Sequence, residues 1–380
     1  METKVWPADE TAIAEAARTL REGGIVAFPT ETVYGLGADA RNPRAVRRVF
    51  EAKGRPSDNP LIVHIADRGQ LEELALPYGG IEARLMEAFW PGPLTIVLPA
   101  RPGAAAPEVT AGLDTVAVRM PAHSVALRLI AAADCPVAAP SANRSGRPSP
   151  TLAAHVLEDL DGRIDGIVDG GPAEVGLEST VVMVEGGRIR VLRPGGVTRE
   201  ALAEAAGCDV IVEAIEDAAS SGNGEGGEPD GANGGASGGE SGLRAGAGPG
   251  AEGGASAAPR SPGMKYAHYA PRGEMTLVIG GREAVRAWIG REAAAARAAG
   301  CLTGVLTWEE HAGHYDADAV VVCGSLARPE QAAQRLYAAL REFDARGIGR
   351  IWAEGCPPEG IGLALMNRLA KAAGGRIVRV

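Results

Sequence analysis

The residues Gly24-Ile-Val-Ala-Phe-Pro-Thr-Glu-Thr-Val-Tyr-Gly-Leu-Gly37 join a short apolar run to a stretch rich in hydroxyl and glycine residues. The run 24–28 has the length and composition of a buried strand. Small and hydroxyl residues after a strand end allow backbone donors to approach a ligand. The same residues also fit a tight turn that uses Gly35 and Gly37. The stretch therefore predicts either a ligand-binding loop or a plain turn.

Similar apolar runs recur up to residue 192 and alternate in part with helical patterns, several of which begin with Asp, Ser, Thr or Pro. Runs without a helix between them, as at 180–192, imply antiparallel pairs, so the sequence predicts a twisted mixed sheet with helices. The expected strands are 24–28, 61–65, 94–98, 115–118, 166–168, 180–184 and 189–192, and the expected helices are roughly 9–22, 43–52, 81–89, 124–132 and 151–160.

A change in composition divides the chain. Residues 219–259 hold 15 glycines in 41 positions, with no aromatic residue and Leu243 as the only large aliphatic one. Such a stretch buries too little apolar surface to offset its ordering entropy, which predicts a flexible, disordered linker. We therefore expect an N-terminal domain over 1–206, an interdomain segment over 207–271 and a C-terminal α/β domain over 272–380.

Strands and helices alternate regularly after the linker. Strands are expected at 275–279, 302–306, 319–323, 350–353 and 377–380, and helices at 281–298, 328–345 and 362–373. This order predicts a small, Rossmann-like open parallel sheet. Because no G-x-G-x-x-G or P-loop pattern is present, a regulatory or structural role is expected for this half.

Composition narrows the class of protein further. The formal net charge of the 380 residues is −10, and the halves 1–206 and 207–380 carry −6 and −4 (21 basic against 27 acidic residues, and 17 against 21). This balance argues against a general polyanion-binding protein, because such binding requires many Lys and Arg side chains. Five widely spaced cysteines without a C-x-x-C pair indicate a reduced protein without a disulfide framework or zinc knuckle. No signal peptide or apolar run of about 20 residues is present, so we expect a cytoplasmic protein without a membrane segment.

Polar motifs between the expected strands carry the candidate chemistry. Lys53 and Arg55 lie two residues apart in a Gly- and Pro-limited segment, which suits phosphate or carboxylate binding, although an exposed basic loop is the alternative. His64 lies within an apolar run, where its residue type alone favours a core histidine over a ligand. Arg119 ends a strand of small residues and fits either a carboxylate clamp or a surface ion pair.

The segment 138–149 is dense in hydroxyl, amide and guanidinium groups, which favours phosphate binding over a simple polar loop. Ser179 and Arg193 add polar groups at later strand ends. No G-x-S-x-G, H-E-x-x-H, kinase or Walker pattern occurs, and the six histidines lack metal-ligand spacing. Catalysis by positioning is therefore favoured over covalent or metal-hydrolytic chemistry.

Together these motifs resemble the L-threonylcarbamoyladenylate synthases, which share a YrdC-like domain. The motifs that carry the resemblance are PTETVYGLG (29–37), KGRPSDNPLIVH (53–64), FWPGPLTIVL (89–98), DTVAVRMP (114–121), APSANRSGRPSPT (139–151), GLESTVV (176–182) and LRPG (192–195). SPGMKYAHYAP (261–271) resembles the interdomain motif of the long, two-domain form, and MNRLAK (366–371) also fits it. The length of the Gly-rich stretch departs from the family pattern.

The resemblance implies a nucleotidyltransferase that converts L-threonine, bicarbonate or CO2 and ATP into threonylcarbamoyl-AMP and diphosphate. It implies ATP as a substrate and no tightly bound cofactor. ATP normally arrives with Mg²⁺ held mainly by its own phosphates, so no metal site on the protein is expected, while the metal requirement is left open. It also implies a downstream transferase machinery that modifies the tRNA adenosine beside the anticodon, while direct tRNA contact is left open. Two alternatives are a double-stranded RNA-binding protein without adenylate chemistry and a carbamoyl-adenylate enzyme. The negative charge of the first half disfavours the former, and the absence of paired cysteines disfavours the latter.

The family's site residues are carried over by the same motifs. The resemblance implies Lys53 and Arg55 as catalytic residues, and a threonine site formed by Thr32, His64, Arg119, Ala139 and Ser179, in which Arg119 holds the carboxylate. It implies a nucleotide site formed by Lys53, Arg55, Asn59, Thr115, Ser141, Asn143, Ser149, Arg193 and Tyr266.

Overall fold

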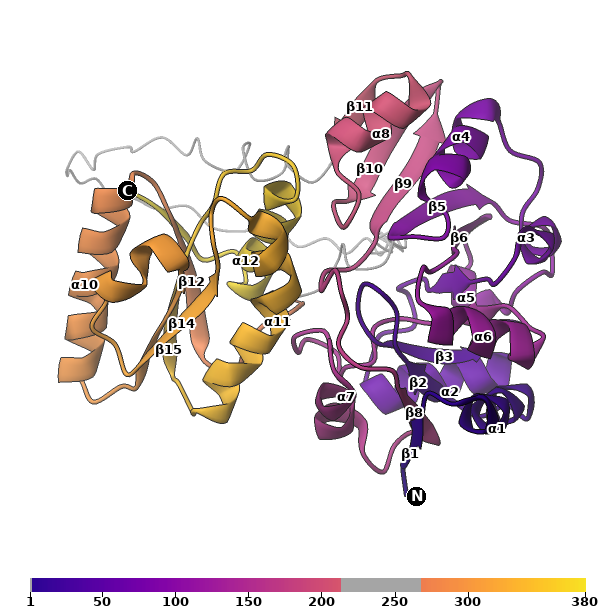
Figure 1. Ribbon diagram of the computed structural model, residues 1–380, viewed down its shortest axis with the longest axis horizontal. Helices are drawn as coiled ribbons and strands as arrows, with labels where there is room; N and C mark the ends of the chain where they lie inside the picture. Colours follow the sequence, from indigo (N-terminus) through magenta and orange to yellow (C-terminus); the bar gives the residue numbers. More distant parts are fainter. Residues whose placement is uncertain (1, 213–267) are drawn as a thin grey trace, which may run out of the picture. The chain divides into compact units, whose positions relative to one another are not determined.

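Two β-sheets with helices packed on them, one in each half of the chain, form the framework of the computed structural model (Figure 1). The structure describes residues 2–212, the N-terminal part, and residues 268–380, the C-terminal part, all of which fall within a single compact unit. The expected linker 219–259 and Tyr266 lie outside the described residues.

The sheet of the N-terminal part has 11 strands in the order β1-β8-β2-β3-β7-β4-β6-β5-β9-β10-β11. Neighbours β4 and β6 are parallel, whereas β5 and β6 are antiparallel, as are β9 and β10, so the expected mixed sheet is confirmed. The strands are β1 (Lys4–Pro7), β2 (Val26–Phe28), β3 (Gly35–Asp39), β4 (Ile62–His64), β5 (Leu94–Pro99), β6 (Thr115–Arg119), β7 (Val137–Ala138), β8 (Gly166–Asp169), β9 (Thr180–Glu185), β10 (Arg188–Arg193) and β11 (Val210–Val212).

Four of these strands were not expected from the sequence: β1, β3, β7 and β11. Gly35 and Gly37, which one of the two sequence interpretations placed in a tight turn, instead lie in β3. This strand pairs antiparallel with β2 and places Gly37 opposite Val26. A Cβ atom on Gly37 would lie 2.7 Å from Val137 Cγ1 and 2.8 Å from Phe28 Cε1. Glycine is therefore needed for close packing in the sheet, and residues 29–34 form the connection between β2 and β3.

Five of the eight helices of the N-terminal part were expected from the sequence, whereas α3, α5 and α8 were not. Asp9 accepts a hydrogen bond from the Ala12 N–H, and Asn42 accepts from Arg44 and Ala45, so both side chains satisfy donors that a helix start leaves open. The helices are α1 (Glu10–Arg21), α2 (Pro43–Lys53), α3 (Arg68–Leu74), α4 (Gly80–Phe89), α5 (Pro107–Thr110), α6 (Ser124–Ala133), α7 (Ala153–Leu160) and α8 (Arg199–Ala206).

The sheet of the C-terminal part is parallel throughout, which confirms the expected open parallel sheet. Its five strands follow the order β14-β13-β15-β12-β16. The elements are β12 (Glu274–Ile279), α10 (Arg282–Ala298), β13 (Thr303–Trp308), the 3₁₀ helix η2 (Glu309–His314), β14 (Ala319–Gly324), α11 (Pro329–Ala345), β15 (Arg350–Glu354), α12 (Gly362–Ala372) and β16 (Ile377–Arg379).

The core of the C-terminal part includes two side chains from the first half. Val33 and Leu177 belong to the same buried apolar cluster as Leu336 and Leu340 of α11. Gly176, at φ +74°, packs so closely on α11 that a Cβ atom would lie 2.3 Å from Gln334 Cα. The segment that carries the GLEST sequence is therefore packed directly against α11. No helix in the described residues is long and apolar enough to cross a membrane.

Candidate functional site

A single pocket gathers most of the polar motifs. Its lining contains all five residues expected for threonine and four expected for the nucleotide, namely Arg55, Ser141, Asn143 and Arg193. The lining residues are Thr30, Thr32, Val33, Gly35, Arg55, Pro60, Leu61, Ile62, His64, Arg119, Ala139, Pro140, Ser141, Asn143, Glu178, Ser179, Arg193, His268 and Tyr269. The pocket thus brings together segments that are more than 200 residues apart in sequence.

Arg119 lies in one wall of the pocket because β4 and β6 run parallel, with Arg119 beside His64. The Arg119 guanidinium donates from Nη1 to Thr32 Oγ1 at 2.8 Å and from Nε to the Gly92 carbonyl at 3.2 Å. Its Nη2 lies 2.7 Å from Glu31 Oε1 in a buried ion pair. Glu31 was not singled out from the sequence, although it lies next to Thr32 in the same motif. Fixed on three sides, Arg119 presents a rigid cation to the pocket.

His64 is a buried, neutral imidazole. Its ring packs edge-on against Phe28, with 6.1 Å between the ring centroids. Burial, reinforced by the neighbouring Arg119, lowers the pKa of His64 to about 3. Its Nδ1 has no hydrogen-bond partner within the described part of the chain, so this atom is available to a ligand.

Ser179 is held between two side chains at the start of β9. Its hydroxyl shares a hydrogen bond with Thr95 Oγ1 at 2.7 Å. Arg193 Nη2 donates to the Ser179 carbonyl at 3.0 Å and to its Oγ at 3.2 Å. Ala139 lies nearby with its N–H bonded to the Ile62 carbonyl. The threonine and nucleotide residues expected from the sequence are therefore in contact through the Ser179–Arg193 pair.

Lys53 does not line the pocket. At the end of α2 its buried ammonium donates to the carbonyls of Ser141 and Asn143, each at 2.5 Å. Burial, with a contribution from Arg55, holds the pKa of Lys53 well below its usual value. Lys53 therefore shapes the backbone of the 141–143 loop, whereas Arg55 reaches the pocket itself.

Three more of the expected nucleotide residues, Asn59, Thr115 and Ser149, are not among the residues that line the pocket. Asn59 is fully buried, and neither amide atom of its side chain has a hydrogen-bond partner among the described residues. Thr115 begins β6, at the opposite end of the strand from Arg119, and pairs with Pro99. Ser149 is fully buried and donates to Glu178 Oε1 at 2.6 Å.

Glu178 is a lining residue that the sequence reasoning missed, although it precedes Ser179 in the GLEST sequence. It accepts hydrogen bonds from Ser149, from Tyr337 of α11 and from Arg368 of α12. Although burial raises its pKa, Arg368 and Arg193 outweigh that effect and bring the pKa of Glu178 to about 2. The pocket therefore contains a carboxylate that is ionised at neutral pH and is held from the second half of the chain.

His268 and Tyr269 complete the lining from the SPGMKYAHYAP motif. From this motif the sequence reasoning selected Tyr266, which lies outside the described residues. Tyr269 packs against Tyr337 with 5.3 Å between ring centroids, and the Arg368 guanidinium lies 5.3 Å from the Tyr269 ring centroid. Burial, together with Arg55 and Lys371, lowers the pKa of His268 to about 3.

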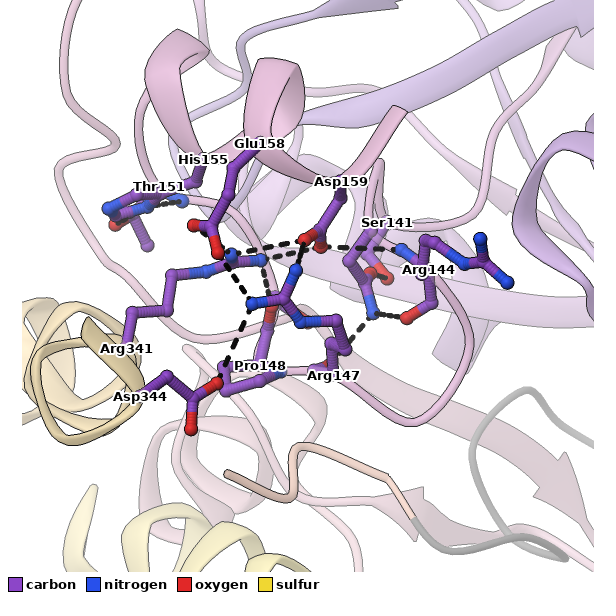
Figure 2. A network of polar contacts seen from close by, with 12 residues as sticks. Ser141, Arg144, Arg147, Pro148, Thr151, His155, Glu158, Asp159, Arg341 and Asp344 are labelled. Atoms are coloured by element: carbon purple, nitrogen blue, oxygen red, sulfur yellow. Dashed lines mark hydrogen bonds and ion pairs between the residues drawn. The ribbon is translucent and has the colours of Figure 1, made fainter. Parts of the chain in front are cut away.

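A second polar network supports the 144–149 loop beside the pocket. Figure 2 shows Arg147 and Arg341 converging on Asp159 of α7. Arg341 Nη2 lies 2.8 Å from Asp159 Oδ2 and also donates to the Pro148 carbonyl at 2.6 Å. Within the described ranges, no group of three or more His, Cys, Asp or Glu side chains could hold a metal ion.

Comparisons with known families match nearly the whole chain. Residues 18–195 match a family described as "Telomere recombination", and residues 198–374 match the "Threonylcarbamoyl-AMP synthase, C-terminal domain". A threonylcarbamoyl-AMP synthase from Bacillus subtilis (strain 168) is 47% identical over the full length of both chains. One from Pyrococcus abyssi (strain GE5 / Orsay) is 44% identical over 98% of this chain and 97% of its own. Among solved structures, P. abyssi Sua5 complexed with L-threonine has a TM-score of 0.83 at 43% identity and covers all of both chains.

Proposed function

Since the chain belongs to the threonylcarbamoyl-AMP synthase family, we propose that its pocket aligns threonine with ATP for the family reaction. The enzyme converts L-threonine, bicarbonate or CO2 and ATP into threonylcarbamoyl-AMP and diphosphate. The observation that carries the proposal is the single pocket in which Arg119, His64 and Ser179 lie beside Arg55 and Arg193. One wall offers groups for an amino acid, and the other offers cations for phosphates.

The proposed threonine site uses the charge of Arg119. Its guanidinium binds the threonine carboxylate, while Thr32 and Glu31 fix its orientation. The open Nδ1 of His64 and the hydroxyl of Ser179 are the polar groups available to the rest of the amino acid. The small side chain of Ala139 leaves space in the same wall.

The chemistry needs no nucleophile from the protein. The threonine amine attacks CO2 and loses a proton to give a carbamate. A carbamate oxygen then forms a bond to the α-phosphorus of ATP, and the bond from that phosphorus to the bridging β-phosphate oxygen breaks. Diphosphate leaves with the bonding electrons. Such a displacement is accelerated mainly by alignment and by stabilisation of the developing charge.

The nucleotide side of the pocket supplies that stabilisation in this proposal. Arg55 and Arg193 place positive charge at the pocket wall, and Ser141 and Asn143 offer neutral polar groups. Lys53 acts indirectly, because its ammonium fixes the backbone of the loop that carries Ser141 and Asn143. We propose that ATP brings Mg²⁺ with it, held mainly by the phosphates.

We also propose the place of this reaction in a sequence. A mixed carbamic–phosphoric anhydride is an activated acyl donor, so a transferase must consume it before water does. The family resemblance implies transfer to the tRNA adenosine beside the anticodon. The proposed site of action is the cytoplasm, where ATP and tRNA are both available.

The test is mass spectrometry of the product formed from ATP, L-threonine and ¹³C-labelled bicarbonate by the full-length chain. The expected product is threonylcarbamoyl-AMP with one heavy carbon, formed together with diphosphate. Two parallel reactions are the controls. In one, L-serine replaces L-threonine. In the other, carbamoyl phosphate replaces both L-threonine and bicarbonate. Diphosphate release only with carbamoyl phosphate would instead support a carbamoyl-adenylate enzyme.

A further inference from the structure

The Glu178 carboxylate accepts hydrogen bonds from side chains of two helices in the C-terminal part. Tyr337 of α11 donates its hydroxyl to both carboxylate oxygens, at 2.9 and 2.8 Å. Arg368 of α12 donates from Nε to Glu178 Oε2 at 2.7 Å. All three side chains are buried, and those of Tyr337 and Arg368 have no exposed surface. Removing either partner therefore leaves a buried carboxylate with one hydrogen-bond partner fewer, which is costly for a charged group.

Arg368 also binds the backbone just after the end of β10. Its Nη2 donates to the Pro194 carbonyl at 3.0 Å. Glu178 immediately precedes Ser179, and Pro194 immediately follows Arg193. Arg368 thus binds the neighbours of both members of the Ser179–Arg193 pair. Gly195 allows these two segments to meet, because a Cβ atom there would lie 2.3 Å from the Glu178 carbonyl.

Several charged or titratable groups surround Glu178. Arg193 approaches from the end of β10, Arg368 and Lys371 from α12, Tyr337 from α11, and His268 and Tyr269 from the segment before β12. Of the two arginines, Arg368 makes the direct contact with the carboxylate, whereas Arg193 directs its hydrogen bonds to Ser179. Arg368 therefore balances the negative charge of Glu178, and the hydrogen bonds of Arg193 remain directed to Ser179.

We propose that Arg368, which neutralises Glu178, and Tyr337, which donates a hydrogen bond to it, are positioning residues that keep Arg193 paired with Ser179 at the pocket wall. Without Arg368, the buried carboxylate attracts Arg193 away from Ser179, because an unpaired buried charge is costly. The C-terminal part thereby contributes directly to the arrangement of the nucleotide and threonine groups. This inference rests on the proposed function, because it concerns the arrangement of the proposed substrate-binding groups. The effect of Arg368 and Glu178 on ATP binding can nevertheless be measured separately from the reaction.

The central experiment is a double-mutant cycle. Arg368→Gln alone should raise the KM for ATP and lower kcat/KM by roughly tenfold or more, within the range typical of coupling between sites. Glu178→Gln combined with Arg368→Gln removes the charge that Arg368 neutralises, and should recover a substantial part of this loss. A pair that serves only stability also couples in a double-mutant cycle, because its two side chains touch. That coupling would appear in the melting temperature and would leave the KM for ATP unchanged. Additive losses, or an unchanged Arg368→Gln enzyme, would overturn the proposal.

Conservative variants and controls complete the test. Arg368→Lys keeps a positive charge beside Glu178 and should retain more activity than Arg368→Gln, and Tyr337→Phe should show a smaller loss of the same kind. Arg346→Gln removes an exposed arginine paired with Glu342 at the end of α11 and should stay within twofold of wild type. If Arg368→Gln does not fold, judged by circular dichroism, the cycle is run with Tyr337→Phe and Glu178→Gln under the same criteria.

Calorimetry with ATP alone separates this proposal from the proposed function. An intact chain that forms no threonylcarbamoyl-AMP contradicts the proposed function, whatever the variants do. The positioning proposal then still predicts that ATP affinity falls in Arg368→Gln and recovers in the double variant. ATP affinity that is equal in wild type and Arg368→Gln contradicts the positioning proposal, even in an active enzyme.

Discussion

Glu31 and Arg119 form a buried ion pair in the pocket wall, with 2.7 Å between Glu31 Oε1 and Arg119 Nη2. Both side chains are more than nine-tenths buried. The cation proposed to bind the threonine carboxylate therefore already has an anionic partner in the protein. Because Arg119 also donates to Thr32 and Gly92, its guanidinium is oriented before any substrate binds.

Replacing Arg119 should remove threonine binding selectively. We expect Arg119→Ala to weaken threonine binding by about 2 to 5 kcal/mol, because one partner of a desolvated charge pair is lost. ATP binding should change much less. Titration calorimetry with each ligand measures both effects, and Arg101→Ala, which removes an exposed arginine that contacts the Glu72 carbonyl, is the matched control. Equal losses for the two ligands, or no loss for threonine, would show that Arg119 is not the carboxylate clamp.

His64 should make stability depend on pH below neutrality. Its pKa falls from 6.5 to about 3 in the folded chain, so between these values the unfolded state binds a proton that the folded state does not. The free energy of unfolding should therefore decrease as the pH falls from 6.5 toward 3. Urea unfolding of wild type and His64→Gln at several pH values measures this, and the variant should show a shallower slope. Identical slopes would mean that His64 titrates normally in the folded protein.

Arg55 and Lys53 should affect the reaction in different ways. Arg55 lines the pocket, so Arg55→Ala should slow adenylate formation at saturating ATP by on the order of a hundredfold, through lost charge stabilisation. Lys53→Ala should slow the reaction and also lower thermal stability, because two loop carbonyls lose their buried donor. Single-turnover rates and melting temperatures of both variants separate these effects. Normal rates in both would place the two side chains outside the reaction.

Arg341 should contribute strongly to stability. Its guanidinium and that of Arg147 flank the fully buried carboxylate of Asp159, and Arg341→Gln leaves that charge with one cationic partner (Figure 2). We expect a loss of about 3 to 5 kcal/mol in the free energy of unfolding, the usual cost of breaking a buried pair from one side. Denaturant unfolding measures it, with Arg346→Gln as the exposed control. A change as small as that of the control would show that Arg147 alone compensates Asp159.

The sequence by itself determined the features that depend on neighbouring residues. The start of α1 follows from Asp9, and that of α2 from Asn42 with Pro43, because capping involves groups only a few residues apart. The regular strand and helix order after the linker was sufficient to predict the parallel C-terminal sheet. The polar motifs also identified most of the pocket, since they follow strand ends that a mixed α/β sheet brings together.

Only the tertiary structure decided which partner each of these side chains meets. The Gly35–Asp39 strand depends on close packing over Phe28, and Lys53 turns toward the 141–143 loop rather than into the pocket. Tyr337 and Arg368 both hydrogen-bond to Glu178, although they lie 159 and 190 positions after it in the sequence. Local propensity and spacing extend over only a few residues, whereas the partner of a buried charge is set by how distant segments pack.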